Sequence, residues 1–383
     1  MFPVIEVNGS AFERGRQHGE QVRERVERSI ATYARLFAYC GMDWRDAQAR
    51  AAPFRDVIGA FDAALLEEIE GIAAGAGRHL KEILALNART EILPPDYPGE
   101  PAPQAKALAE RNRGAGVPDW GECTALAVPR GASATGGTLL AQNWDWLGQQ
   151  RGALILLRAT EDDGTEVLTL TEAGMLAKIG LNSHGFGVCL NILRSRDDGT
   201  HPGVPVHVLL RALLRRRSVA DAIEYAGRLA FGASSNVHCA DVSGDCAGLE
   251  CSPRGLYVLR GKGATLCHTN HFLCIDPQAH EIALARSLST RPRLARADAL
   301  VADLNRVSPR LGVADLQRVL RDESEGYLSI CRQPDPSLAL ELRLESVAGI
   351  VMELDKRVMH VAPDIPSKTG FTAVTLQREG AFA

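Results

Sequence analysis

A proline-rich segment at residues 92–121 divides this sequence into two parts with different hydrophobic patterns. Its prolines stand at positions 94, 95, 98, 101, 103 and 118, with glycines at 99, 114 and 116 among them. Proline lacks a backbone N–H and fixes φ, so a helix or strand cannot continue through such a segment. The sequence therefore predicts an exposed loop that joins two differently patterned parts of the 383-residue chain.

The part before this loop has the pattern of amphipathic helices. In residues 20–36, apolar side chains recur at three- and four-residue steps, at Val22, Val26, Ile30, Tyr33 and Leu36. This spacing places them on one face of a helix. Residues 61–72 and 83–93 repeat it, so we expect a helical N-terminal segment that extends to about residue 91.

The part after the loop reads mainly as short strands joined by turns. The predicted strands are 123–128, 138–143, 153–158, 166–171, 186–191, 236–242, 247–250, 256–260, 264–268, 348–354 and 357–361. Helices are predicted at 206–216 and 220–229, and a helical block at 279–320. Because hairpins pair strands in antiparallel fashion, the predicted class is α+β, with helices packed on antiparallel sheets.

Composition excludes several classes of function. The net charge is −4 and aromatic residues make up 5% of the chain, so neither the charge nor the stacking surface of a nucleic-acid binder is present. No apolar run is long enough for a membrane helix, and the N-terminus lacks the pattern of a signal peptide. Nine cysteines, an odd number spread over a long chain, favour free thiols, so we expect a cytoplasmic protein.

Cys123 opens the first predicted strand, directly after the proline-rich loop. A free cysteine is most often a small buried apolar residue, and this residue alone is compatible with that role. If the Glu122–Cys123 bond were cut, however, Cys123 would carry a free α-amine beside its own thiol. An α-amine has a pKa of about 7.7–8.0, so one residue would supply both a nucleophile and its base.

Several short motifs occur together with this cysteine in a fixed order. They are Gly-Glu-Cys-Thr at 121–124, Gln-Asn-Trp-Asp at 142–145, Thr-Glu-Ala-Gly at 171–174, Gly-Leu-Asn-Ser-His-Gly at 180–185 and His-Thr-Asn-His at 268–271. Two more, at 12–19 and 85–91, lie in the N-terminal part. With them the chain resembles the penicillin acyltransferase-like family of cysteine N-terminal-nucleophile (Ntn) hydrolases, also grouped as peptidase C45. That resemblance covers nearly the whole chain.

The resemblance implies a four-layer αββα sandwich and a precursor that cleaves itself. The pieces would be residues 1–122, with the helical segment and the loop, and residues 123–383, with the Ntn-hydrolase core. The two pieces would remain associated, and a homo-oligomer is left open. The implied enzyme is an amidohydrolase or N-acyltransferase without a cofactor, acting on a small N-acyl amine, with acyl-coenzyme A as an alternative acyl donor. Neither a nucleic acid nor a membrane is expected as a partner.

The resemblance also implies roles for single residues. Cys123 matches the nucleophile, Asp145 the acid that helps to hold its amine, and Asn270 an active-site amide that can donate to an oxyanion. Ser252 matches a serine tied to processing and activity, whereas Asn191 and Ser346 match positions near the substrate. Glu172, in the motif at 171–174, has the simpler interpretation of pairing with an arginine.

The sequence departs from the penicillin acyltransferase at two of these places. Glu122 stands where that enzyme has glycine before the nucleophile, which puts the rate of cleavage in question. Val347 stands where it has an arginine near the substrate, which argues against the same substrate.

Three other interpretations stay open at this stage. Histidines and cysteines gather at positions 238, 239, 246, 251, 267, 268, 271 and 274, but their spacing fits no compact zinc motif. A conventional Cys–His hydrolase would pair Cys123 with His18 or His271 and would need no chain cleavage. A protein of this fold could also act by binding alone.

Overall fold

The computed structural model describes residues 1–93, 123–261, 264–285, 287 and 289–376, and its strands form two sheets. The eight-stranded sheet has the order β1 (Val4–Val7), β4 (Leu154–Thr160), β5 (Glu166–Glu172), β6 (Ile179–Asn182), β7 (Phe186–Ile192), β8 (Ser235–Asp241), β9 (Cys246–Ser252) and β10 (Gly255–Arg260). The six-stranded sheet has the order β11 (Leu266–His268), β2 (Cys123–Val128), β3 (Leu139–Leu147), β12 (Leu344–Glu353), β13 (Val358–Ala362) and β14 (Thr372–Thr375).

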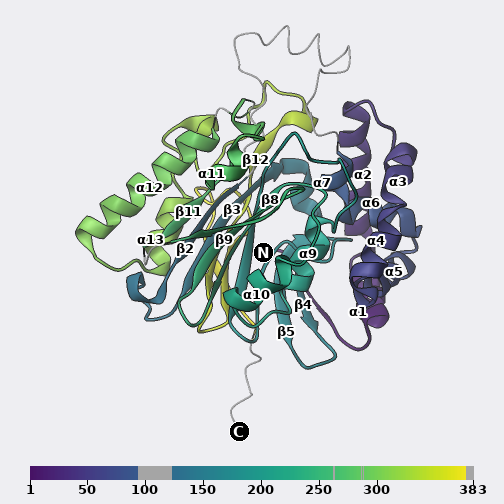
Figure 1. Ribbon diagram of the computed structural model, residues 1–383, viewed down its shortest axis with the longest axis horizontal. Helices are drawn as coiled ribbons and strands as arrows, with labels where there is room; N and C mark the ends of the chain where they lie inside the picture. Colours follow the sequence, from purple (N-terminus) through teal and green to yellow (C-terminus); the bar gives the residue numbers. More distant parts are fainter. Residues whose placement is uncertain (94–122, 262–263, 286, 288, 377–383) are drawn as a thin grey trace.

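The helices lie on the outer faces of these sheets (Figure 1). Those over the eight-stranded sheet are α1 (Ala11–Gln21), α2 (Arg23–Tyr39), α3 (Trp44–Ala51), α4 (Phe54–Phe61), α5 (Ala63–Ala76), α6 (Leu80–Asn87), α7 (Arg89–Ile92), α9 (Val206–Leu213) and α10 (Val219–Ala226). Over the six-stranded sheet lie α12 (Thr290–Val307) and α13 (Val313–Leu320), and the short α11 is Ile275–Gln278. Because β2 and β3 contact β7 and β8, the layers run helix, sheet, sheet, helix. The predicted α+β class and four-layer sandwich are confirmed.

The three predicted hairpins are confirmed as the antiparallel pairs β2–β3, β4–β5 and β12–β13. All pairs within the two sheets are antiparallel except β1 with β4, which is parallel and joins Val4 to Leu156. The strands β1, β6 and β14 were not predicted, since each has only four residues. Of the predicted loop, residues 94–121 lie outside the described part of the chain, as does Glu122.

Two helix predictions were wrong at their beginnings. The helical block predicted from residue 279 begins only at Thr290, because residues 280–282 exchange backbone hydrogen bonds with residues 194–196 instead. The helix predicted at 61–72 is interrupted at Asp62, whose side chain accepts the Leu65 N–H and begins α5. Long-range pairing explains the first error, and an N-cap explains the second.

Helices α1 and α5 touch through their backbones at four glycines. A Cβ atom on Gly15 would lie 1.9 Å from the Glu68 carbonyl oxygen, and one on Gly75 would lie 2.0 Å from that of Arg16. Gly19 and Gly71 are as closely packed. No side chain fits between the two helices at these positions, so their crossing requires glycine.

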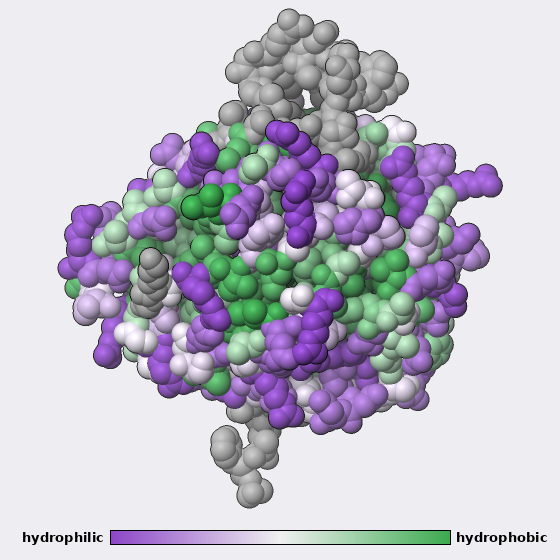
Figure 2. All heavy atoms as spheres, viewed as in Figure 1, coloured by the Kyte–Doolittle hydropathy of each residue, from purple (hydrophilic) through white to green (hydrophobic). Residues whose placement is uncertain are grey.

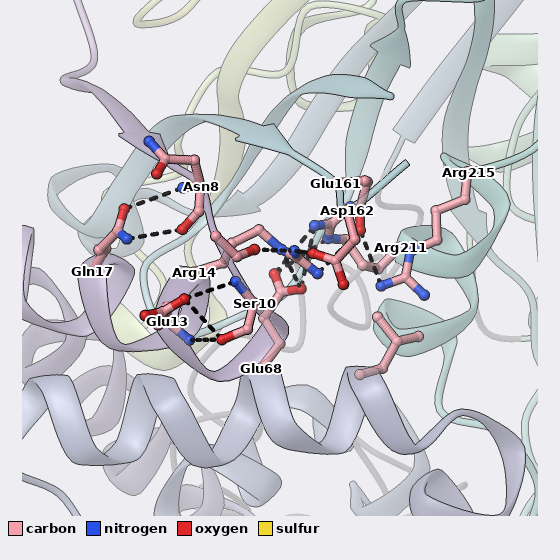
Figure 3. Close-up of polar contacts among 12 residues, drawn as sticks. Asn8, Ser10, Glu13, Arg14, Gln17, Glu68, Glu161, Asp162, Arg211 and Arg215 are labelled. Carbon is pink, nitrogen blue, oxygen red and sulfur yellow. Dashed lines mark hydrogen bonds and ion pairs between the residues drawn. The ribbon is translucent and has the colours of Figure 1, made fainter. Parts of the chain in front are cut away.

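This crossing lies next to a buried charge cluster that we define as Arg14, Glu68, Glu161, Arg211 and Arg215 (Figure 3). Arg14 Nη2 lies 3.1 Å from the Glu161 carboxylate, and Arg211 Nη2 lies 3.3 Å from that of Glu68. Arg215 Nη2 adds a 3.3 Å contact to Glu161, which Arg211 also contacts. The cluster joins α1 and α5 to the β4–β5 turn and to α9.

The surface is mixed in character. On the face in view, apolar residues gather near the centre and hydrophilic residues surround them (Figure 2). The exposed large apolar side chains are scattered along the chain, at Met1, Val4, Phe12, Val258, Ile275, Val307 and Leu340. None of the helices in the described ranges has the length and apolar character needed to span a bilayer.

Candidate active site

Cys123 lies at the start of β2, where the two sheets face each other. It is opposite Trp144 of β3 and only 1% exposed. Side chains directly opposite each other on antiparallel strands share a face of the sheet. The Trp144 ring centroid lies 4.0 Å from the ammonium of Lys178, which precedes β6 in the eight-stranded sheet. The Cys123 side chain therefore belongs to the face that looks toward the other sheet.

Side chains from three distant segments hold the main chain of Cys123. Its N–H donates to Asn270 Oδ1 at 3.0 Å. Its carbonyl oxygen accepts from Arg293 Nη1 at 2.6 Å and from Asn191 Nδ2 at 3.2 Å. Both polar main-chain atoms of the residue are thus fixed by buried side chains.

Asn270 follows β11 and is itself held in place from several sides. Its backbone N–H donates to Thr290 Oγ1 at 2.8 Å, and its Nδ2 donates to the Ile192 carbonyl at 3.0 Å. Its Oδ1 accepts from Arg293 at 2.9 Å as well as from Cys123. The amide oxygen, rather than the amide nitrogen, therefore faces the Cys123 main chain.

Asn191 reaches the site from β7, across the space between the sheets. Asn236, its partner on β8, donates from Nδ2 to Asn191 Oδ1 at 3.0 Å. That bond fixes the orientation of the Asn191 amide, so Nδ2 points to the Cys123 carbonyl. The family resemblance predicts a position near the substrate for Asn191, and the structure brings it into contact with Cys123.

Asp145 and Ser346 form a second buried pair nearby. Ser346 on β12 is in register with Asp145 on β3, and its hydroxyl donates to Asp145 Oδ1 at 2.6 Å. The register shifts between Ser346 and Ala348, so the fully buried Val347 occupies an irregularity in the strand. The Ser346 hydroxyl in turn accepts the Arg332 N–H at 2.9 Å. Because successive strand residues alternate in direction, Asp145 lies on the other face of β3 from Trp144.

Ser252 lies apart from these contacts. It ends β9, and its hydroxyl accepts the Arg254 N–H at 3.1 Å, which is the bond of a local turn. The hydrogen bonds of Cys123, Asn270 and Asn191 described above do not include Ser252, so they lend its predicted role in processing no support.

Arg293 is not among the predicted site residues, yet it is 1% exposed and contacts both Cys123 and Asn270. It also donates to Thr124 Oγ1 at 3.0 Å and to Ser289 Oγ at 3.1 Å. A signal did exist in the sequence, because Arg293 shares the buried face of α12 with Ala297 and Val301 at four-residue steps. An arginine on the apolar face of a helix is uncommon and indicates a bonded partner inside the protein.

The residues of the zinc alternative have other partners. His268 Nε2 lies 2.9 Å from the Glu250 carboxylate, and His238 Nε2 lies 3.0 Å from the Leu266 carbonyl oxygen. Burial raises the pKa of Cys246 to about 12, so this thiol stays protonated near pH 7. Across the described ranges no group of three His, Cys, Asp or Glu side chains is placed to hold a metal ion.

The histidines of the Cys–His alternative are also engaged elsewhere. His18 Nε2 accepts the Gly174 N–H at 3.0 Å, and His271 Nδ1 lies 2.9 Å from Thr290 Oγ1. Burial lowers the pKa of each to about 4, so both rings are neutral near pH 7. Neither ring makes a hydrogen bond to Cys123 in the described structure.

Comparison with known proteins identifies the family. Residues 133–339 match the model of the acyl-coenzyme A:6-aminopenicillanic acid acyl-transferase family, which is more than half of the chain. This range includes Asp145, Asn191, Ser252, Asn270 and Arg293, and it begins after Cys123. The chain is 31% identical over 273 residues to the 40 kDa form of the acyl-coenzyme A:6-aminopenicillanic-acid-acyltransferase of Emericella nidulans. That match covers 70% of this chain and 66% of the relative, just under two thirds of the relative's length.

Two solved structures show more distant likeness. A variant of the conjugated bile acid hydrolase from Clostridium perfringens aligns with a TM-score of 0.46 and 13% identity, over 66% of this chain and 92% of that one. Penicillin V acylase from Agrobacterium tumefaciens aligns with a TM-score of 0.35 and 14% identity, over 62% and 82% of the two chains. The family match confirms the resemblance noted in the sequence: the chain belongs to the acyl-coenzyme A:6-aminopenicillanic acid acyl-transferase family.

Proposed function

We propose that this chain is a self-processing enzyme that uses Cys123 as an N-terminal nucleophile to cleave or transfer the acyl group of a small N-acyl amine. The observation that carries the proposal is the bonding of the Cys123 main chain. Asn270 holds its nitrogen, and Asn191 and Arg293 hold its carbonyl oxygen. Such bonding fixes the one residue whose nitrogen and sulfur would both take part in the reaction.

The first step is cleavage of the precursor. The Cys123 thiol attacks the carbonyl carbon of Glu122, the new C–S bond forms, and the Glu122–Cys123 C–N bond breaks as the nitrogen takes the proton. Water then opens the thioester and leaves a Glu122 carboxylate and a free Cys123 thiol. The freed α-amine has a reference pKa of about 7.7–8.0, so its neutral form is available as a base near pH 7.

In the mature enzyme the same residue performs turnover. The amine takes the thiol proton, the sulfur attacks the amide carbonyl of the substrate, and the amine later protonates the leaving nitrogen. Asn270 Oδ1, which accepts the Cys123 N–H, would orient this amine. We propose that Asp145 helps to set its protonation state and that the Ser346 hydroxyl fixes Asp145. The role of Ser252 in processing, implied by the family, remains part of this proposal.

The substrate is expected to differ from 6-aminopenicillanic acid. Val347 replaces the arginine of the penicillin enzyme, and here it is fully buried in the strand. A small N-acyl amine, or acyl-coenzyme A as the acyl donor, would form the acyl-thioester on Cys123. Water as acceptor gives a hydrolase, and a second amine gives an acyltransferase.

The test compares the wild type with Cys123→Ala by intact mass and a denaturing gel. The wild type should give two pieces, and the larger should begin Cys-Thr-Ala-Leu. Cys123→Ala should stay a single chain and be inactive on a panel of N-acyl amines and acyl-thioesters. Cys239→Ala is the matched control, because that buried thiol lies on β8 and should not affect cleavage.

An active wild type that remains one chain would contradict the proposal and favour a Cys–His hydrolase. Turnover by Cys123→Ala would remove Cys123 from the mechanism. Amide hydrolysis that does not depend on coenzyme A would select the hydrolase over the acyltransferase.

A further inference from the structure

A buried turn at Glu172–Leu176, which we name the 172–176 turn, makes most of its side-chain hydrogen bonds to the N-terminal helices, beside backbone bonds such as that from the Ala173 N–H to the Ala153 carbonyl at 2.9 Å. It lies between β5 and β6, on the 123–383 side of the predicted cleavage site. Gly174 N–H donates to His18 Nε2 at 3.0 Å, and the Gly174 carbonyl accepts from Asn87 Nδ2 at 2.9 Å. Leu176 N–H donates to Asn87 Oδ1 at 3.0 Å. Two side chains from α1 and α6 thus satisfy three backbone groups of this turn.

Helix α2 contributes two further bonds. The Ser29 hydroxyl donates to the Ala173 carbonyl at 2.8 Å, and the Tyr33 hydroxyl donates to the Glu172 carboxylate at 2.6 Å. Arg89 lies 3.5 Å from the same carboxylate, which confirms the expected arginine partner of Glu172. Ser29, Tyr33 and Asn87 are all fully buried, so water cannot replace these partners in the folded protein.

The fit around the turn is also close in shape. Gly174 has φ +94°, and a Cβ atom there would lie 2.7 Å from Leu86 Cδ1 on α6. Two more contacts join the same halves of the chain. Strand β1 adds a parallel edge to β4, and the charge cluster brings Arg14 and Glu68 against Glu161 and Arg211. Directional contacts therefore link residues 1–93 to residues 123–376 at the turn, at β1 and at the charge cluster, besides single bonds such as that from the Val206 N–H to the Glu91 carboxylate at 2.8 Å.

We propose that the 172–176 turn is the main docking site that retains residues 1–93 as a separate polypeptide after the chain is cut, with β1 and the charge cluster as supporting contacts. As an interface between two polypeptides it rests on the proposed cleavage. The occupant is the chain's own N-terminal piece, which binds the turn through His18, Ser29, Tyr33 and Asn87.

This docking site is connected to Cys123 through a short path. Two residues after the turn, the Lys178 ammonium lies 4.0 Å from the centroid of the Trp144 ring, and Trp144 pairs with Cys123. Loss of the N-terminal piece would leave the backbone groups of the turn without their partners and release the segment that carries Lys178. The N-terminal piece is therefore required for activity although it supplies no reacting atom.

The test uses two buried asparagines as a matched pair. Asn87 bridges the two pieces, whereas Asn182 binds four backbone groups within the 123–383 piece, at Leu214, Arg216, His184 and Phe186. Asn→Asp at either position removes the donated bonds and keeps the size of the side chain. Each variant is made in full-length Cys123→Ala that carries a protease recognition sequence within residues 94–121. Added protease then cuts every chain, whether or not the wild type cuts itself.

Separation of the pieces is followed by size exclusion over a dilution series at one fixed, moderate urea concentration. The protein concentration at which half of the pieces have separated should rise about tenfold or more in Asn87→Asp, as expected for loss of a buried hydrogen bond. Asn182→Asp should leave it unchanged, even if both variants lower the melting temperature of the uncut chain. If Asn87→Asp does not fold, Ser29→Ala replaces it in the test, because it removes only the hydroxyl that binds the Ala173 carbonyl. Ser29→Ala should also promote separation of the pieces.

If the cut Asn87→Asp and Ser29→Ala pieces stay together as firmly as the Asn182→Asp pieces, the docking proposal is wrong. The proposed function fails separately, if the wild type shows no cut before Cys123. In a self-cleaved wild type, pieces separated in urea should be inactive alone and regain activity when mixed. An active 123–383 piece would overturn the inference.

Discussion

The charge cluster and the Cys123 site are both buried and polar, but they satisfy their polar groups in different ways. In the charge cluster, Arg14 and Arg211 face the carboxylates of Glu68 and Glu161. At the Cys123 site, Arg293 donates to neutral oxygens, among them the Cys123 carbonyl and Asn270 Oδ1. In the cluster, arginines form ion pairs with carboxylates, whereas at the Cys123 site amides and a guanidinium hold main-chain atoms by hydrogen bonds.

This difference teaches what each region contributes. Removing one partner of a buried ion pair leaves an uncompensated charge, so a change in the cluster should reduce stability more than catalysis. Removing a group that fixes Cys123 leaves the nucleophile in place but badly oriented, so a change there should reduce turnover more than stability. Three predictions test this division, in order of decreasing expected effect.

The largest effect is expected from Arg211→Met. Arg211 is fully buried and contacts both Glu68 and Glu161, so its loss leaves two buried carboxylates with fewer partners. We expect the free energy of unfolding to fall by about 3–5 kcal/mol, measured by urea titration. The kcat of the protein that remains folded should change little.

Arg254→Met is the control for this prediction, because the Arg254–Asp197 pair at 2.6 Å lies at the surface and should contribute little to stability. Equal losses in the two variants would show that burial of the cluster does not matter. A large fall in kcat without a loss of stability would place Arg211 in the catalytic machinery.

The second prediction concerns how the stability of the folded protein depends on pH. Burial and the nearby Arg211 cation lower the pKa of His18 to about 4, from its usual 6.5. Between these values the unfolded chain binds a proton that the folded chain does not, so stability falls as the pH falls from about 6.5 to about 4. His18 should account for a loss on the order of 3 kcal/mol over that window.

His18→Gln should flatten this part of the curve of unfolding free energy against pH, since glutamine can accept the Gly174 N–H without titrating. Some slope should remain, because burial also lowers the pKa of His238 to about 3 and of His271 to about 4. An unchanged slope in His18→Gln would mean that the ring is already protonated or exposed in the folded protein.

The smallest of the three effects is expected from Arg293→Lys. Lysine keeps the charge but lacks the planar fork that reaches Cys123, Thr124 and Asn270 together. We expect kcat to fall about 10- to 100-fold, as for loss of a charged hydrogen bond, with a smaller change in KM. The melting temperature should fall less than in Arg211→Met.

Arg296→Lys, on the same helix, is the matched control, because Arg296 pairs with Asp322 at 2.6 Å near the surface. It should leave kcat unchanged. If Arg293→Lys instead raises KM and leaves kcat intact, Arg293 acts on substrate binding and not through Cys123.

Much of the fold could be predicted because the hydrophobic period changes across the proline-rich segment. Strands β2 and β7 were predicted nearly residue by residue, since each is a continuous buried run bounded by turn residues. The four-residue strand β1 could not be found in this way, because its pairing partner β4 lies some 150 residues away in the sequence. The late start of α12 has the same cause, a tertiary contact that no local pattern encodes.

The candidate site was predicted in part. The resemblance supplied Cys123, Asn191 and Asn270, which the structure brings together, and Asp145 with Ser346, which form a pair of their own. Arg293 was missed because several arginines occur in its helix, and only its spacing to Ala297 and Val301 on one helix face distinguishes it in the sequence. The motifs at 12–19, 85–91 and 171–174 were recognised without an explanation, and the structure supplies one, since His18, Asn87 and Gly174 meet at a single turn.

The glycines of α1 and α5 have a consequence for how this protein tolerates change. The two helices approach until Gly15 meets Glu68 and Gly75 meets Arg16, so one added methyl group at either position would act as a wedge. Its effect would spread from the helix pair to the neighbouring salt bridges, because Arg14 and Glu68 flank the same crossing. Alanine, elsewhere the mildest replacement in a helix, should here be among the most damaging.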